Sequence, residues 1–389
     1  MMKTFFVLLF IIVTFLFTIS GCSDNPSSLG IDLIPQEDFL NVDTLTVYST
    51  TERLYQSRHP LGSSQTIAVG RAESLEAYVL ISFLSMPDTM AGSTVNSVEL
   101  TLFPNYIIGD STGTVSFDVC ELMSGWSESS FTWDSLAILP FDGTVVGSFT
   151  GAVTDSDSVV VSISPQLISK WFSNAANILP TYGLLLKPNR PAAPGQVIRG
   201  FESFQGTRIP YIRIIATQNS QIDTFTLSTG YDTYVVNGSP VVDPLKSIYI
   251  QPTLGYNTLL TFDVSKLPRD ALIHQAIMEL TSSSGYSFYS RPTTDSVLAT
   301  FIVDSTAQSD FYDSSPPIST RTGNVYSMNI ATMVQRWGRG FPNQGVRIKA
   351  YDDYRGSYSL GTVNPFIFYN SKSDISLRPR LKILYSTIR

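Results

Sequence analysis

Two clusters of the sequence place tyrosine and arginine close together. The denser cluster holds Tyr351, Tyr354, Arg355 and Tyr358, and the other holds Tyr286, Tyr289 and Arg291. A tyrosine ring offers a flat apolar face and a hydroxyl, and an arginine adds planar hydrogen-bond donors. Such side chains suit stacking on sugar rings and hydrogen bonding to their hydroxyls, so we expect these clusters to bind carbohydrate. The alternative, that the tyrosines only cover strand edges, stays open.

Acidic pairs offer oxygen ligands in two expected loops. The weak candidates for a structural calcium ion are Asp155, Asp157, Asp352 and Asp353. Neither pair has the spacing of a dedicated calcium-binding loop, so solvated loop acids are the default interpretation. The sequence predicts no other cofactor.

Side chains suited to catalysis are scarce, because the chain has only 2 His. His59 and His274 lie in different halves of the chain without a Gly-x-Ser-x-Gly element, and we expect both to be incidental surface residues. Glu99 and Glu279 stand at equivalent positions of an internal repeat and are expected to face outward on a sheet. We therefore predict no catalytic residues, and a glycan-active enzyme ranks third among the possible functions.

The composition excludes further classes of protein. The 389 residues carry a net charge of −7 and are 43% hydrophobic and 15% charged, which indicates a folded chain. Binding to nucleic acid would need clustered cations, so we expect no nucleic acid among the partners of this chain. The later half is richer in tyrosine, because 13 of the 19 Tyr follow residue 222.

The N-terminus has the pattern of a bacterial lipoprotein signal. Lys3 precedes an apolar run from Phe5 to Phe17, and Ile19-Ser20-Gly21 leads to Cys22, the expected site of lipidation. We predict a signal peptide over 1–21 and a polar tether over 22–41. Ser23 after the cysteine favours the outer membrane, with the cell surface preferred to the periplasmic face. Multiple acyl chains on Cys22 would anchor the protein stably.

Short alternating runs separated by Gly, Pro, Asn, Asp and Ser predict antiparallel strands throughout. Several runs occur twice in the same order. Leu80-Ile81-Ser82-Phe83 matches Leu259-Leu260-Thr261-Phe262, and Gly183-Leu184-Leu185-Leu186-Lys187 matches Gly345-Val346-Arg347-Ile348-Lys349. We therefore predict two β-sandwich domains over 42–217 and 222–389, joined by the polar segment 218–221. Cys120 lies in one of the strands and is expected to be a small buried residue without a disulfide partner.

Each unit is expected to contain one short helix. Ser164 can cap the first helix and Pro165 suits its first position, with Leu167, Ile168 and Trp171 on one face. The second unit repeats this face with Ile330, Met333, Val334 and Trp337. Trp126, Trp133, Trp171 and Trp337 are expected to anchor the cores.

The order of these elements resembles a known family. The first unit contains Trp126-Ser127-Glu128-Ser129-Ser130-Phe131-Thr132-Trp133-Asp134, then a helix ending in Trp, Gly-Leu-x-Leu and Pro-x-Ile-x-Ile. This order is similar to the DNRLRE type of β-sandwich domain, whose relatives include carbohydrate-binding modules on surface proteins. The second unit lacks the Trp-Asp element and has Ser309-Asp310-Phe311-Tyr312-Asp313 near that place. The resemblance implies an all-β fold of two tandem jelly-roll-like domains with an extracytoplasmic binding role.

Together these features predict a lipid-anchored cell-envelope protein that binds extracellular polysaccharide without transforming it. The alternative is a structural or adhesive envelope protein that binds other proteins through strand edges or the surface between the domains.

Overall fold

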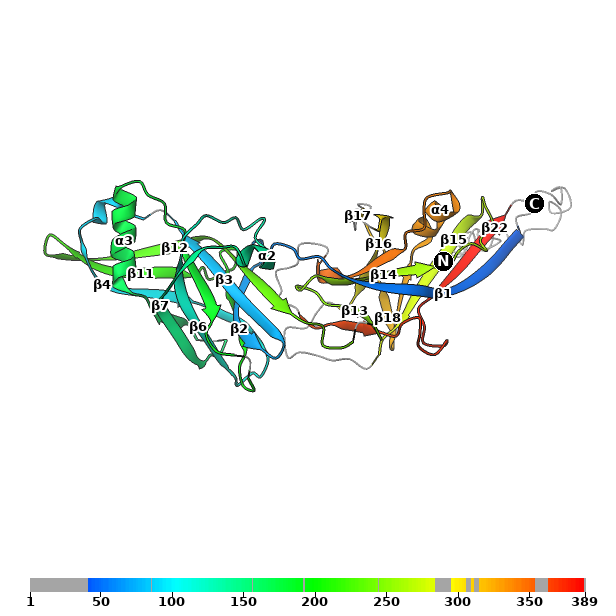
Figure 1. Ribbon diagram of the computed structural model, residues 1–389, viewed down its shortest axis with the longest axis horizontal. Helices are drawn as coiled ribbons and strands as arrows, with labels where there is room; N and C mark the ends of the chain where they lie inside the picture. Colours follow the sequence, from blue (N-terminus) through cyan, green and yellow to red (C-terminus); the bar gives the residue numbers. More distant parts are fainter. Residues whose placement is uncertain are drawn as a thin grey trace, which may run out of the picture.

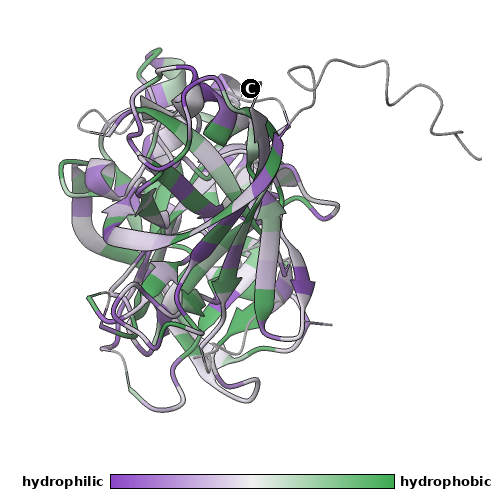
Figure 2. Ribbon diagram, turned by 90° about the vertical axis from the view of Figure 1, so that its right-hand side faces the viewer, coloured by the Kyte–Doolittle hydropathy of each residue, from purple (hydrophilic) through white to green (hydrophobic). Residues whose placement is uncertain are grey.

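The computed structural model describes residues 41–387, apart from 85, 156, 192, 244, 284–294, 306–308, 311–314 and 354–362. The predicted signal peptide, Cys22 and nearly all of the tether lie outside the described residues. The described chain is mostly strand, as the alternating pattern predicted, and hydrophobic and hydrophilic residues alternate along many strands (Figure 2).

The strands form two large antiparallel sheets that lie at opposite ends of an elongated molecule (Figure 1). The first sheet has 11 strands: β2 (Thr66–Ala72), β3 (Leu75–Phe83), β4 (Thr94–Leu102), β5 (Pro104–Ile108), β6 (Thr114–Leu122), β7 (Phe141–Ala152), β8 (Val159–Ser162), β9 (Leu184–Pro188), β10 (Ile198–Glu202), β11 (Tyr211–Gln218) and β12 (Gln221–Gly238). The second sheet has 9 strands: β1 (Asn41–Gln56), β14 (Tyr256–Phe262), β15 (Leu272–Thr281), β16 (Val297–Asp304), β17 (Ser309–Asp310), β18 (Thr320–Thr322), β19 (Val325–Asn329), β20 (Val346–Ala350) and β22 (Arg380–Thr387). A separate pair joins β13 (Ile248–Ile250) to β21 (Phe366–Phe368).

The sheets do not divide where the predicted domains divide. β1 precedes the whole first sheet in sequence but pairs with β22 and β14 of the second sheet. β12 pairs with β11 and β3 of the first sheet. The segment 218–221, expected to join the two domains, instead forms a hairpin turn between β11 and β12, with positive φ of 52° at Asn219 and 65° at Ser220. Two successive positive φ values are typical of the two-residue turn that suits the twist of paired strands. The division into two domains stays a prediction.

β1 and β12 each bend from one partner strand to another, which curls both sheets. β12 pairs with β11 up to Ser228 and with β3 from Thr229 onward, with a bulge at Gly230. β1 pairs with β22 up to Tyr48 and with β14 from Ser49 onward, with a bulge at Thr50. A bulge adds one residue to a strand and increases its local bend, so each long strand can join two flanks of its sheet.

Both expected helices are present. α3 spans Pro165–Ala176 and α4 spans Ala331–Gly338, and their buried faces include the residues expected from the spacing. The expected cap is wrong, because the Ser164 hydroxyl donates to Gln166 Oε1 and caps no backbone N–H. A shorter helix, α2 (Trp133–Leu136), begins at a capping box between Thr132 and Ser135. Two 3₁₀ turns cover Asp88–Met90 and Tyr351–Asp353.

The hydrophobic core follows the two sheets. One cluster includes Trp171, and a second includes Trp337. Trp126 and Trp133 were also expected in a core, but they are only partly buried and pack against a smaller cluster around Phe131. Each fully buried large apolar side chain contributes about 1.5–3 kcal/mol. Cys120 on β6 is free and buried as expected, and burial raises the pKa of its thiol. Within the described ranges, no helix is long and apolar enough to cross a membrane.

Candidate functional site

The second sheet brings together described residues that flank the two segments 284–294 and 354–362. β16 begins after the segment 284–294, and β20 ends before the segment 354–362. These strands pair with Val297 opposite Ala350. The pairing continues beyond the strands, because the Tyr351 amide donates to the Ser296 carbonyl at 3.1 Å. Ser296, which follows the first segment, therefore lies beside Tyr351 ahead of the second segment.

The opposite ends of the same two segments also approach each other. β15 leads into the segment 284–294, and β21 follows the segment 354–362. The Ser283 amide donates to the Ile367 carbonyl of β21 at 2.9 Å, and Ser282 forms a bridge with Phe368. The described residues that flank the two segments are thus neighbours on both sides, although about 70 residues separate the segments in the sequence.

A charged and aromatic cluster lies at this junction. Asp295 accepts a hydrogen bond from Arg321 Nη1 at 2.7 Å and another from the Tyr326 hydroxyl. The Arg321 guanidinium lies 5.2 Å from the centre of the Tyr326 ring. That ring packs edge-on against Phe368 of β21 at 5.1 Å, which holds the cluster beside the ends of both segments. Arg321 Nε also donates to the Gly323 carbonyl at 2.8 Å, and with 43% of its side chain exposed, part of the guanidinium is open to a ligand.

The electrostatics of the cluster keep Asp295 ionised. Burial opposes its charge, but the hydrogen bonds from Tyr326 and Arg321 outweigh this and lower its pKa. Burial and the neighbouring Asp295 carboxylate raise the pKa of Tyr326. Tyr326 therefore stays a neutral donor at ordinary pH. Because Tyr326 is 3% exposed and belongs to the core, the groups of the cluster that face solvent are the Asp295 carboxylate and the Arg321 guanidinium.

The sequence did not single out Asp295, Arg321 or Tyr326. Arg321 and Tyr326 face each other across the short hairpin of β18 and β19. The signal that could have found them is Thr320-Arg321-Thr322-Gly323-Asn324-Val325-Tyr326, in which a Gly-Asn turn lies between an arginine and a tyrosine.

Most of the predicted binding residues cannot be placed. Tyr286, Tyr289, Arg291, Tyr354, Arg355 and Tyr358 lie outside the described residues. Tyr351 is described: it is half-buried at the end of β20. The structure therefore places Tyr351 alone among the predicted binding residues, and the other six stay predictions.

The candidate calcium ligands have other contacts. Asp155 forms an ion pair with Arg199, and Asp157 accepts from the Thr154 hydroxyl at 2.6 Å. The hydrogen bonds from Thr154 lower the pKa of Asp157. Asp352 is 2% exposed, and the side chain of Asp353 lies outside the described part. Among the residues that the structure describes, no group of three His, Cys, Asp or Glu is placed to share a metal ion.

Neither histidine forms a recognisable nucleophile pair with an accessible hydroxyl. His59 is half-buried rather than on the surface as expected, and burial and Lys349 lower its pKa. His274 is exposed, and its Nε2 lies 2.9 Å from Ser386 Oγ. Ser386 is only 1% exposed, so a substrate has no approach to this hydroxyl.

The two equivalent glutamates form ion pairs across neighbouring strands. Glu99 accepts from Arg213 at 2.7 Å. Glu279 accepts from Lys382 at 2.8 Å and also from Arg380. Burial of Glu279 opposes its charge, but these two cations prevail and lower its pKa. A glutamate that is held ionised between two cations is poorly suited to act as a general acid.

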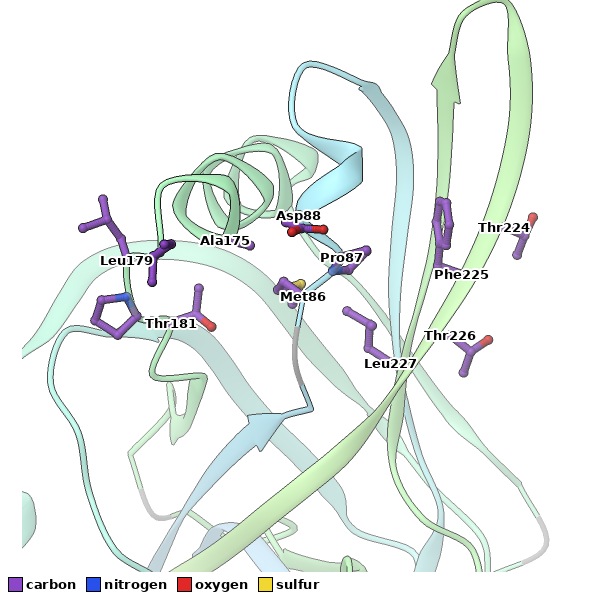
Figure 3. Close-up of a pocket in the computed structure, with 12 residues that line it drawn as sticks. Met86, Pro87, Asp88, Ala175, Leu179, Thr181, Thr224, Phe225, Thr226 and Leu227 are labelled. Carbon is purple, nitrogen blue, oxygen red and sulfur yellow. The ribbon is translucent and has the colours of Figure 1, made fainter.

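A second feature is an apolar groove at the far end of the first sheet, with a volume of about 1050 Å³ (Figure 3). Met86 and Pro87 line it on one side, and the chain after α3 lines it with Leu179 and Pro180. Phe225 and Leu227 point into it from β12, whereas Thr224 and Thr226 point the other way. Ile178 at the rim is 93% exposed. An isoleucine so open to solvent is consistent with a contact surface.

The second sheet carries a smaller groove of about 380 Å³ at the corresponding place. Leu267 and Pro268 stand where the first unit has Met86 and Pro87, and Phe341 follows α4 as Leu179 follows α3. Phe341 is 57% exposed. The two grooves therefore share two walls, the turn that ends in proline and the chain after the helix, whereas Phe225 and Leu227 of β12 line the first groove only.

We find no family model that matches this chain, and no match among curated proteins or solved structures.

Proposed function

We propose that this chain is a noncatalytic binding protein of the cell envelope, anchored by lipid at Cys22, which holds extracellular polysaccharide with the Tyr/Arg segments of its second half. We also propose that the strands of this chain form two jelly-roll-like β-sandwich domains. One observation carries the binding proposal: the described residues on both sides of the segments 284–294 and 354–362 are hydrogen-bonded to each other, Tyr351 to Ser296 and Ser283 to Ile367. This pairing supports the proposal that the two clusters of the same chemistry form one binding surface.

The described residues at this location add to the same chemistry. Tyr351 lies at the start of one segment, and the Asp295–Arg321–Tyr326 cluster lies at the end of the other. Rings stack on the C–H faces of sugars, while a guanidinium and a carboxylate bind hydroxyls or acidic groups. Because the supporting residues belong to paired strands, the ligand would meet a partly fixed surface.

A glycan array tests the proposal with the chain that follows residue 22. We expect retention of a polysaccharide, lost in the double variant Tyr354→Ala/Arg355→Ala and weakened in Arg321→Ala. The control is Tyr182→Ala/Arg190→Ala, which removes the same residue types from the first half. Absence of glycan retention by the wild-type chain would refute the proposal, and turnover of a bound glycan would establish an enzyme instead.

The repeated apolar groove favours a second candidate, an adhesive or structural role through a protein neighbour in the envelope. A photo-cross-linking amino acid at position 178, in the groove rim, tests it. The matched control is position 138, because Ile138 is 84% exposed and lies outside the groove. A discrete protein adduct at 178 but not at 138 supports this role, and equal labelling at both positions contradicts it.

A further inference from the structure

The first strands of the two repeats are equivalent. From its third residue β1 has Asp43-Thr44-Leu45-Thr46, and from its third residue β12 has Asp223-Thr224-Phe225-Thr226. β1 pairs with β22 through Leu45 opposite Ile383, and β12 pairs with β11 through Phe225 opposite Ile214. The second halves agree as well, since each strand has its bulge one residue after Ser49 or Thr229, opposite Phe262 or Phe83. The two strands therefore occupy the same position between two neighbouring strands in two copies of one scaffold. We call this position the slot.

Each first strand fills the slot of the other repeat. β12 starts the second repeat in sequence but completes the first sheet, between β11 and β3. β1 starts the first repeat but completes the second sheet, between β22 and β14. Two identical exchanges of this kind show that the slot accepts a first strand that comes from another repeat.

The two slots differ in how their strand is attached. The two-residue turn at Asn219 and Ser220 joins β12 directly to β11, so β12 has no other slot within reach. β1 has no such turn, because the start of β1 and the end of β22 are separate parts of the chain at Asn41 and Thr387. Only residues 57–65 connect β1 onward to the first sheet. The slot of the second sheet is thus filled by β1, which is connected directly along the chain to the first sheet.

β1 is held by its two ladders and by polar side-chain contacts with the second half, such as Thr51 with Thr261 and Glu52 with Ser371, and little of it is buried. Of its 16 residues only Ser49 is buried, and Leu45 and Val47 are the ones that pack partly against the second core. In β12, by contrast, Asp232, Thr233, Tyr234, Val235 and Val236 are all buried. A strand held by its ladder fits equally well into the same slot of an identical chain, because every pairing is reproduced there.

We propose that the slot between β14 and β22 is a strand-binding site that receives β1 from a second copy of this chain. The hinge lies at residues 57 and 58. Ser57 bonds to Gly255 of the second half, and Arg58 bonds to Asn237 at 3.1 Å and to Asp134 in the first half. Exchange changes the path of these residues and keeps the two ladders of β1. It takes place while the chains fold, because a closed chain would have to break both ladders at once.

Disulfide trapping in the full-length chain tests the proposal. Two differently tagged copies are produced together, one with Thr46→Cys and the other with Lys382→Cys, since these positions are paired between β1 and β22. The matched control uses Thr226→Cys and Arg213→Cys, which are paired at the equivalent place between β12 and β11. Each pair of substitutions removes one cation from an ion pair: Lys382 pairs with Glu279, and Arg213 pairs with the equivalent Glu99. The effects of the two pairs on the fold are therefore comparable.

We expect a disulfide-linked product that carries both tags, at least about tenfold more abundant than with the control pair. The single-chain variant Thr46→Cys/Lys382→Cys reports whether the two positions form a disulfide in this geometry. Linkage in that variant, together with no more mixed product than the control pair gives, would overturn the proposal. The pair Thr44→Cys and Leu384→Cys, two residues along the same ladder, repeats the measurement with an independent contact.

Discussion

The buried carboxyl group of Asp232 makes a sharp prediction about stability and pH. Asp232 lies on β12 and is 1% exposed. Its Oδ2 accepts a hydrogen bond from the Phe204 amide at 2.7 Å, and its Oδ1 is buried without a hydrogen-bond partner. Burial raises its pKa to about 7, and the nearby Glu128 adds to the rise, while the Phe204 amide opposes it.

The sign and size of the effect follow from linkage. The folded-state pKa lies above the unfolded value of 3.8, so folding favours the protonated acid. The stability that this group contributes is full below pH 3.8, falls as the pH rises toward 7, and stays low above 7. A shift of about 3 units at 1.36 kcal/mol each corresponds to about 4 kcal/mol in total, of which about 2–3 kcal/mol falls between pH 5 and 8.

Asp232→Asn removes this dependence, because an amide keeps the oxygen that faces Phe204 and does not ionise. Urea unfolding at several pH values, followed by tryptophan fluorescence, measures the effect. Three of the four Trp residues lie in the half that contains β12, so this signal reports chiefly on the relevant sheet. We expect the free energy of unfolding of the wild type to fall by about 2–3 kcal/mol relative to Asp232→Asn between pH 5 and 8.

We compare how the free energy of unfolding changes with pH, rather than its value at one pH, because this removes the constant cost of burying the asparagine amide. Glu52 stands at the equivalent position of β1, and its Oε1 accepts from the Ser371 amide at 2.8 Å. Glu52→Gln is therefore the control that should leave the contribution of Asp232 in place. Parallel stability curves for wild type and Asp232→Asn across this range would refute the reasoning.

Three further predictions concern the backbone, the core and the anchor. Gly183→Ala should lower the melting temperature clearly, because its φ is +100° and a Cβ would lie 2.0 Å from the Ile81 oxygen. Gly195→Ala should lower the melting temperature less, because its φ is +79° but no atom lies within 4 Å of the added Cβ. Equal decreases in melting temperature for the two variants would contradict the steric argument. Trp171→Ala should destabilise the first sheet by about 3–5 kcal/mol in urea unfolding, since Trp171 is 1% exposed; a loss below 1 kcal/mol would count against this packing. Cys22→Ala should leave the protein soluble and unprocessed on cell fractionation, and its recovery with membranes would argue against lipidation.

The sequence was informative where the structure depends on local pattern. Alternating apolar residues predicted strands, and the Pro165 start with Leu167, Ile168 and Trp171 on one face predicted α3. The paired motifs predicted a repeat, and the structure gives the repeated residues corresponding places, such as Glu99 and Glu279 on β4 and β15. These features are fixed within a few residues of sequence, so no knowledge of distant partners is needed.

The exchange of first strands could not be predicted in this way. Asp43-Thr44-Leu45-Thr46 and Asp223-Thr224-Phe225-Thr226 fit either slot equally well, because they have the same pattern. Only the length of the Asn219-Ser220 turn decides where β12 goes, and a polar four-residue segment resembles a linker until its strand pairing is known. The candidate site was hidden for a similar reason, since the contact between Tyr351 and Ser296 depends on long-range register.

The repeat also explains why the proposed ligand is assigned to one half. The segment after β15 corresponds to the chain after β4, which in the first half forms β5 and pairs with β10. Its tyrosine, Tyr106, is only 4% exposed and belongs to the core. The segment after β20 corresponds to 189–197, where the sequence has proline and glycine instead of tyrosine. The positions that complete the sheet in the first half thus correspond to the Tyr/Arg segments in the second half, which is why the proposed binding is assigned to the second half alone.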